Sequence, residues 1–434
     1  MATGAGGEAS VASSAHRVRR LLGGRAALWT GFALVHALLV ALNLHASGWP
    51  LGDVEAVYLH WAQSAANGWL RMGIDVPWVY PILAFAPMAA SLAFGAEWYP
   101  ETWLALVTVL DAAAFAILLG RDRLSRRRRI AAWWWLGFLI LLGPIALGRI
   151  DAVTVPFAIA GLLWAVGRPR LAAALLTIGA WIKVWPAALV AALVIVHRRR
   201  GEVITVAVAL SAGIVVVSLL AGSGLNVVGF IAEQAGRGLQ VEAPVGVFWL
   251  WQVVAGVDGV GIAYDRDILT YQISGPGVDV AVALTTPVMA VAVLAVVLLG
   301  VRAARRGATV GQLLAPLSLT FVVVLMLANK VGSPQFATWL AAPVILGLAL
   351  RPGRFRAPAI LAWVVAGTTH IVYPYWYGWL LAANPAFVLV MTLKVGVLVA
   401  IAAWGARALW QAGNVRAGFR AEAPASAVAR SEEA

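Results

Sequence analysis

The chain has 434 residues, of which 62% are hydrophobic and only 12% are charged. A soluble domain carries roughly 25% charged residues, so the composition excludes an ordinary soluble protein and predicts an integral membrane protein. The formal net charge is +13, but the arginines stand in short clusters between apolar runs. That is the positive-inside pattern of a membrane protein, and it predicts membrane lipids and no nucleic acid as partners.

Residues 1–25 form a basic tail that we expect to be disordered and cytoplasmic, and we expect the same of residues 406–434. Residues 26–405 are predicted to form a single all-α transmembrane domain. Several of its apolar runs are shorter than the roughly 20 residues that span a bilayer, which is tolerated where protein covers them. The expected helices cover residues 26–45, 102–120, 130–147, 152–167, 171–182, 184–197, 202–221, 278–300, 309–327, 335–349, 357–370 and 382–404.

The arginine clusters predict which loops share one side of the membrane. All of them can lie on the cytoplasmic side, together with both termini, only if the segment 80–95 does not cross. We therefore interpret 80–95 as a re-entrant or interfacial helix within a long first external loop, residues 46–101. The result is a bundle of about 12 transmembrane helices in the plasma membrane, with both ends in the cytoplasm. The main clusters are 121–129, 168–170, 198–200, 302–306 and 351–356.

The opposite, extracytoplasmic side then collects acids, bases and aromatic residues. A base within hydrogen-bond reach can deprotonate an acceptor hydroxyl, and Lys or Arg can hold the charge of a phosphate leaving group. Aromatic rings can stack on sugar. Together these groups favour chemistry on a lipid-linked substrate. The candidates are Asp53, Glu55, Trp78 and Tyr80 in the first loop, Arg149 and Asp151 in the second, Lys183 at a hairpin tip, Arg237 and Glu242 in a long loop, and Lys330.

Asp53 and Glu55 are two residues apart, after Pro50 and Gly52, which favour a turn. We expect one of the two acids to point into the site. The alternative is that Asp53 only caps the helix that follows. Lys183 lies in the apolar run AWIKVWP, where it either binds a lipid phosphate, snorkels or forms a structural pair.

Other candidates also have simpler interpretations. Arg149 and Asp151 are placed to form a surface ion pair, and Arg237 and Glu242 likewise. Structural roles are expected for three charged or polar residues within the predicted helices. We expect Asp111 to form a hydrogen bond to a neighbouring helix, His36 to pack between helices and Lys394 to snorkel. The six histidines show no ligand spacing, so we predict no histidine-based metal site.

The order of these features resembles the GT-C glycosyltransferases, and more narrowly glycosyltransferase family 87, the polyprenol-phosphate-mannose-dependent mannosyltransferases. The resemblance extends from about residue 50 to about residue 350. The segments that carry it are GDVEAVYLHWA (52–62), WVYPILAFAPM (78–88), LGRIDAV (147–153), AWIKVWP (180–186), GRGLQVEAP (236–244) and NKVGSPQFATWL (329–340).

The resemblance implies an inverting transfer of a hexose, expected to be mannose, from a polyprenyl-phosphate sugar donor to a lipid or glycan acceptor. It implies that Asp53 is the general base, with Glu55 as the second choice. The acid of the second loop carries over to Asp151, and the buried basic position of the hairpin to Lys183. Lys183, Arg237 and Lys330 are expected to hold the departing phosphate, so neither a metal nor a cofactor is expected.

Two other functions remain open from the sequence. A transporter or lipid flippase would place polar residues near the bilayer midplane along a two-sided path. A catalytically inactive relative that scaffolds other envelope enzymes is the third possibility.

Overall fold

The computed structural model describes residues 24–266 and 268–414, so most of each predicted tail lies outside the described residues. The first described helix, α2 (Arg25–His45), begins where the domain was expected to begin. The last, α18 (Pro385–Ala412), continues past residue 406, where the second tail was predicted to start. The protein is nearly all α-helical, as predicted.

Within the described residues, eight helices are long and apolar enough to cross a membrane, which supports the prediction of a membrane protein. Besides α2 and α18 they contain α5 (Tyr99–Leu119), α6 (Arg126–Leu142), α10 (Arg200–Leu220), α13 (Val278–Arg305), α14 (Val310–Leu327) and α16 (Pro352–Val372). The spans at α5 and α6 include the adjoining 3-10 turns and cover Ala96–Leu119 and Arg126–Ala146. The other four expected helices are also present, and they are shorter than these eight. They are α7 (Ile150–Trp164), α8 (Pro169–Ile182), α9 (Pro186–Val196) and α15 (Ala341–Leu350), which follows the 3-10 helix η7 (Pro334–Leu340).

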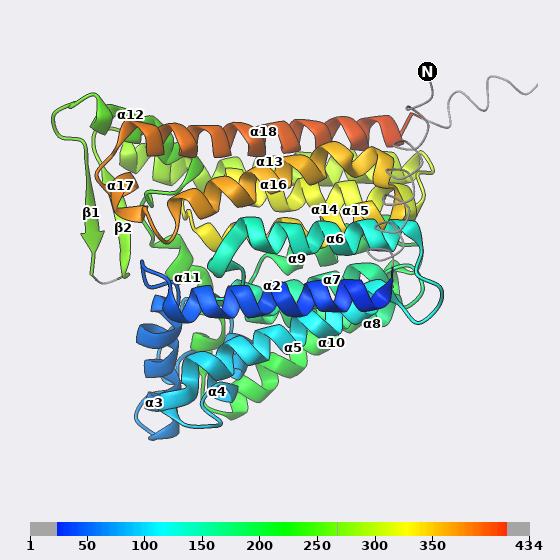
Figure 1. Cartoon of the computed structure of the whole chain (residues 1–434), viewed down its shortest axis with the longest axis horizontal. Coiled ribbons are helices and arrows are strands. Elements are labelled where there is room, and N and C mark those ends of the chain that lie inside the picture. Colours follow the sequence, from blue (N-terminus) through cyan, green and yellow to red (C-terminus); the bar gives the residue numbers. More distant parts are fainter. Residues whose placement is uncertain (1–23, 267, 415–434) are drawn as a thin grey trace, which may run out of the picture.

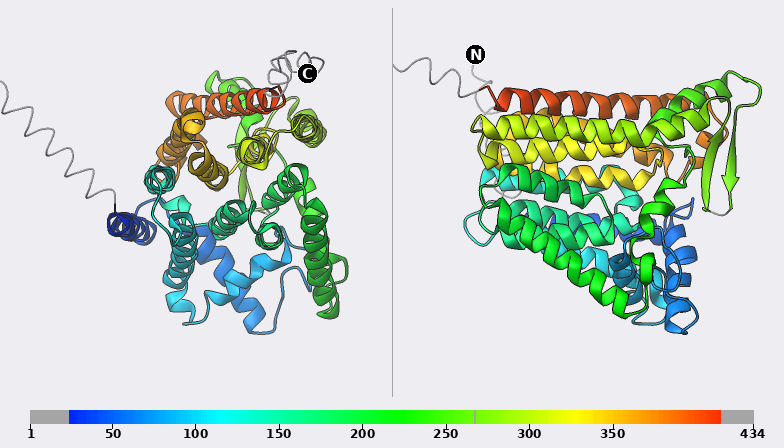
Figure 2. Two further views of the ribbon diagram at one scale, coloured as in Figure 1. Left: turned by 90° about the vertical axis from the view of Figure 1, so that its right-hand side faces the viewer. Right: turned by 180° about the vertical axis from the view of Figure 1, so that it is seen from behind.

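Long and short helices run along one axis in a single bundle (Figure 1). The short helix α15 and most of α7 are buried, whereas α10 and α13 lie on the outside of the bundle (Figure 2). Only 11% of the most apolar window of α10, and of α13, is buried inside the protein. A helix that is apolar all round and yet exposed requires a lipid environment.

Local sequence signals set many of the helix ends. Proline stands at the start of α5, α8, α9, α16 and α18, where its missing N–H costs no helical hydrogen bond. Ser125 caps α6, and Thr309 forms a capping box at the start of α14. Gly120 ends α5 with a φ of 68°, a conformation that favours glycine.

One end of the bundle carries the long connections. The first connection contains η1 (Asp53–Tyr58), α3 (Leu59–Ala66), η2 (Ile82–Ala84), α4 (Phe85–Ala90) and η3 (Ala96–Trp98). The second contains η5 (Gly224–Val228), α11 (Phe230–Ala235), η6 (Pro244–Gly246), α12 (Val247–Val254) and the antiparallel strands β1 (Gly261–Asp265) and β2 (Thr270–Ser274). With α17 (Tyr377–Leu381), these elements cover the left end of the bundle in Figure 1.

The predicted helix over 80–95 is reduced to η2 and the six-residue α4. Neither is long enough to cross a bilayer. A re-entrant or interfacial position for this segment stays a prediction. The opposite end of the bundle holds the start of α2 and the end of α18, with the arginine-rich connections between the helices (Figure 1).

Candidate functional site

Asp53 and Arg149 form an ion pair at the end of the bundle that carries the long connections. Asp53 Oδ2 lies 3.0 Å from Arg149 Nε, and the Asp53 side chain is 42% exposed whereas that of Arg149 is 7% exposed. Asp53 begins the π-helical turn η1 and makes no capping hydrogen bond, so the capping interpretation is wrong. The predicted surface pair between Arg149 and Asp151 is wrong as well, because Arg149 turns toward the first loop instead.

The main chain around Arg149 holds its guanidinium in place. Nη1 donates hydrogen bonds to the carbonyl oxygens of Pro50 at 2.6 Å and Gly148 at 2.8 Å, and Nη2 donates to the hydroxyl of Tyr373. Burial opposes the charge of Arg149, but Asp53 and then the nearby tyrosines outweigh burial and raise its pKa. Arg149 is therefore a fixed positive charge beneath a carboxylate that is open to one side.

Asp151 and Lys183 form a second, buried pair. Asp151 is fully buried; its Oδ1 accepts a hydrogen bond of 2.6 Å from the Trp339 indole, and its Oδ2 lies 3.5 Å from Lys183 Nζ. Lys183 links the end of α8 to the start of α9, and its Nζ lies 4.5 Å from the centre of the Tyr80 ring. Of the three interpretations of Lys183, the structure shows the structural pair, with Asp151 as the partner. Lys183 also makes a cation–π contact with Tyr80.

Tyr58 joins the two pairs. Its buried hydroxyl accepts a hydrogen bond of 3.3 Å from the main-chain N–H of Ile150, next to Asp151. Burial raises the pKa of Tyr58 well above its usual range, so the hydroxyl stays protonated. The Tyr58 ring also contacts that of Tyr80. Tyr58 thus links Tyr80 to the main chain at Ile150, the residue between Arg149 and Asp151.

The other two first-loop candidates lie differently from what was expected. Glu55 accepts a hydrogen bond from the Trp49 indole and is not paired with Arg149, so the two acids point to different partners. Trp78 is 3% exposed and packs edge-on against Tyr80 and Trp61. Burial of Trp78 assigns it to the packing of the loop rather than to a free sugar-stacking surface.

Glu242 is buried beside the site and pairs with a residue from the last helix. Its Oε2 lies 3.4 Å from Lys394 Nζ. The predicted pair between Arg237 and Glu242 and the snorkelling of Lys394 are both wrong, because the loop folds back over α18. Burial raises the pKa of Glu242, while Lys394 and then Arg149 act to lower it, so Arg149 is within electrostatic reach.

Lys330 and Arg237 bind the long loop to the connection before η7. Lys330 Nζ donates a 2.6 Å hydrogen bond to the carbonyl oxygen of Ala235, and the Lys330 carbonyl accepts one of 3.0 Å from Gln240. With its amide oriented to satisfy both neighbours, Gln240 also accepts from Arg237 at 3.1 Å and donates to the carbonyl oxygen of Gly332 at 2.9 Å. Both cations therefore have structural partners close to the Glu242–Lys394 pair.

An apolar cavity adjoins the same pair. Glu242 and Lys394 are among its lining residues, and further lining side chains come from α14, η7 and α18. The apolar lining residues include Met326, Phe336, Met391 and Leu398. Polar and apolar surfaces thus meet within a short distance of the candidate site.

Sequence reasoning did not predict the roles of four residues that hold the site together: Tyr58, Tyr373, Trp339 and Lys394. Tyr58 and Trp339 stand in the segments GDVEAVYLHWA (52–62) and NKVGSPQFATWL (329–340), but neither was given a role in the site. The hydrogen bond expected between Asp111 and a neighbouring helix is confirmed, because Asp111 Oδ2 of α5 lies 3.2 Å from Nε2 of His36 of α2, a residue that was expected only to pack. Comparisons with known protein families, curated proteins and solved structures found no match, so the family resemblance remains an expectation from the sequence.

Proposed function

We propose that the protein is a membrane glycosyltransferase that transfers a hexose, with mannose as the expected sugar, from a polyprenyl-phosphate donor to a lipid or glycan acceptor. The observation that supports this most is the pair of Asp53 and Arg149. It sets a partly exposed carboxylate, which can accept a proton, directly against a fixed, buried positive charge, which can attract a phosphate.

In the proposed reaction the acceptor hydroxyl oxygen attacks the anomeric carbon of the donor sugar from the side opposite the phosphate. A bond forms between that oxygen and the anomeric carbon, the bond from this carbon to the phosphate oxygen breaks, and the configuration inverts. Asp53 takes the hydroxyl proton. The polyprenyl phosphate leaves with the electron pair, and Arg149 stabilises its charge in a partly dry site.

The surrounding groups have supporting roles. The Asp151–Lys183 pair fixes the loop that carries Arg149 and places a second positive charge near Tyr80. Glu55, on the same turn as Asp53, is the second choice for the base. The apolar cavity beside Glu242 and Lys394 offers a surface that suits part of a prenyl chain. Tyr80, partly exposed, is the aromatic ring proposed to meet the sugar.

The topology is part of the proposal. Twelve crossings, with both termini in the cytoplasm and the site outside the plasma membrane, agree with the position of the arginine-rich connections at the end opposite Asp53. Of the four shorter helices, α7 and α15 are buried among the others and α8 and α9 are partly buried, so neighbouring protein covers much of each short crossing.

The experiment is a transfer assay with the purified protein in proteoliposomes. Radiolabelled mannosyl and glucosyl polyprenyl phosphates are supplied with membrane lipid or glycan extracts as acceptors. The proposal expects label in a product of inverted anomeric configuration, with no need for added metal. Retained configuration would contradict the mechanism, and absence of label from every product with both donors would contradict the function.

Transport is the alternative from the sequence, and the same vesicles test it. The buried pair His36–Asp111 lies between α2 and α5, but His36 also contacts the carbonyl oxygen of Phe32 on its own helix. The pair is therefore satisfied within the packing. Movement of a fluorescent polyprenyl-phosphate sugar between leaflets, without sugar transfer, would favour a flippase over the proposed enzyme.

A further inference from the structure

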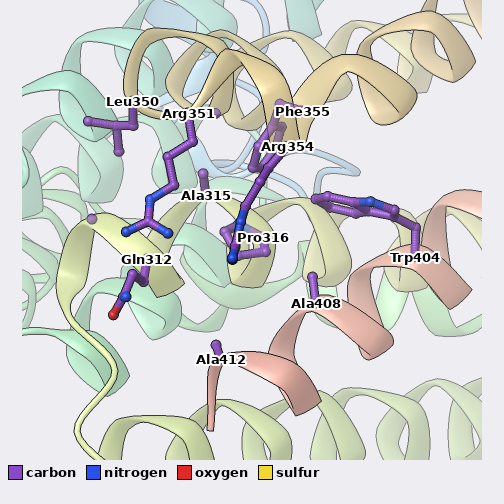
Figure 3. A pocket seen from close by; sticks show the side chains of 12 residues that line it. Gln312, Ala315, Pro316, Leu350, Arg351, Arg354, Phe355, Trp404, Ala408 and Ala412 are labelled. Carbon is purple, nitrogen blue, oxygen red and sulfur yellow. The ribbon is translucent and has the colours of Figure 1, made fainter. Parts of the chain in front are cut away.

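A cationic pocket lies at the end of the bundle opposite the candidate site. Its walls come from the start of α14, the end of α15, the start of α16 and the last turns of α18. Figure 3 shows Arg351 and Arg354 extending from the start of α16 toward Gln312 and Pro316 of α14, with Trp404 of α18 on the far side.

The two arginines of this pocket have no acidic partner among residues 24–266 and 268–414. The ion pairs in that part of the chain all involve other side chains. A third arginine, Arg127 of α6, adds positive charge nearby. Burial, followed by the charges of Arg354 and Arg127, lowers the pKa of Arg351. Like charges gathered without a counter-ion are stabilised by an anion that binds between them.

The rest of the pocket is apolar. Phe355 is buried, and the Trp404 ring stands edge-on to it with the ring centres 5.1 Å apart. Pro316, Ala315 and Ala408 complete this side. A small soluble anion would use only the arginines, whereas a ligand with a phosphate head and hydrocarbon tails would use both parts of the surface.

The position of the pocket identifies the source of such a ligand. The pocket lies where α14 begins, α15 ends and α18 approaches its last residue, so in a membrane it is at the level of the headgroups. We propose that Arg351 and Arg354 bind the phosphate of an anionic phospholipid whose acyl chain lies against Trp404 and Ala408. This site is separate from the proposed sugar transfer and does not depend on it.

The test compares lipid binding by the full chain and by charge-matched variants. Purified protein in detergent is titrated with phosphatidylglycerol, with phosphatidylcholine, or with inorganic phosphate, and its melting temperature is recorded. R351Q/R354Q removes the pocket charges. R121Q/R123Q removes the same charge from exposed residues at the same end of the bundle. R354Q alone changes only an exposed member of the pocket and serves if the double variant does not fold.

We expect phosphatidylglycerol to stabilise the unmodified protein more than phosphatidylcholine does. Its apparent affinity should fall about tenfold or more in R351Q/R354Q, as expected for the loss of two charge-assisted contacts, and stay within about twofold in R121Q/R123Q. An equal fall in both variants would overturn the proposal, since the effect would then be one of net charge. Equal stabilisation by inorganic phosphate would overturn the assignment to a lipid.

Discussion

The buried pair of Asp151 and Lys183 allows a quantitative prediction about stability. In Lys183→Met the Asp151 carboxylate, which is fully buried, keeps its hydrogen bond from Trp339 but loses the positive charge 3.5 Å away. Breaking a buried ion pair by removing one partner costs roughly 3–5 kcal/mol, because the remaining charge is uncompensated. Lys183 is 15% exposed, so water screens part of the interaction, and we expect a loss near the lower end, about 3 kcal/mol.

The assay is unfolding of the purified protein in mixed micelles of increasing SDS content, followed by tryptophan fluorescence. The double variant Asp151→Asn/Lys183→Met is the matched control, because the neutral amide no longer needs the lysine. It should recover most of the lost free energy of unfolding. Arg71→Met, at an exposed pair in the first loop, should change little. The reasoning is refuted if the single and double variants are equally destabilised, or if neither differs from the unmodified protein.

Three further predictions concern the site and its orientation. A Cβ at Gly332 would overlap the main chain of Glu242, so Gly332→Ala should lower the melting temperature by several degrees. Gly213→Ala is the control and should not lower it, because a Cβ at Gly213 meets open space. Equal melting temperatures for the two variants would contradict this packing. Arg149→Lys should reduce sugar transfer at least about tenfold, because one ammonium group cannot replace the planar guanidinium, which contacts two carbonyl oxygens and a carboxylate. Unchanged transfer by this variant would contradict the role of Arg149. Since the chain contains no cysteine, Trp69→Cys in the exposed first loop should react with an impermeant maleimide in intact cells, and reaction only after permeabilisation would reverse the topology.

Helix positions could be predicted because apolar runs, prolines and arginine clusters are local signals. All the expected helices are present, and the loops at one end bring Asp53, Arg149, Asp151 and Lys183 close together. The number of crossings could not be settled in the same way. Helices such as α9, with 11 residues, fall below the usual span, and their ends depend on what the neighbouring helices cover.

The partner of each charge could not be predicted, because pairing is decided by contacts between distant segments. Arg149 and Asp151 are neighbours in sequence, yet the first turn of α7 buries Asp151 against Trp339, 188 residues away, while Arg149 stays with the first loop. Glu242 meets Lys394 across 152 residues because the long loop folds over α18. The strands β1 and β2, five residues each, were also missed, since short polar-containing runs give little periodic signal.

The central claim is that Asp53 acts as the base in sugar transfer, and the transfer rate of Asp53→Asn tests it most directly. Asp75→Asn is the matched control, because it removes a carboxylate paired with an arginine in the same loop. Glu55→Gln tests the second choice. Asp53→Asn should lower the rate by about 10²-fold or more with donor binding retained, while Asp75→Asn stays near the unmodified protein. Full transfer by Asp53→Asn, with transfer abolished by Glu55→Gln, would contradict the account.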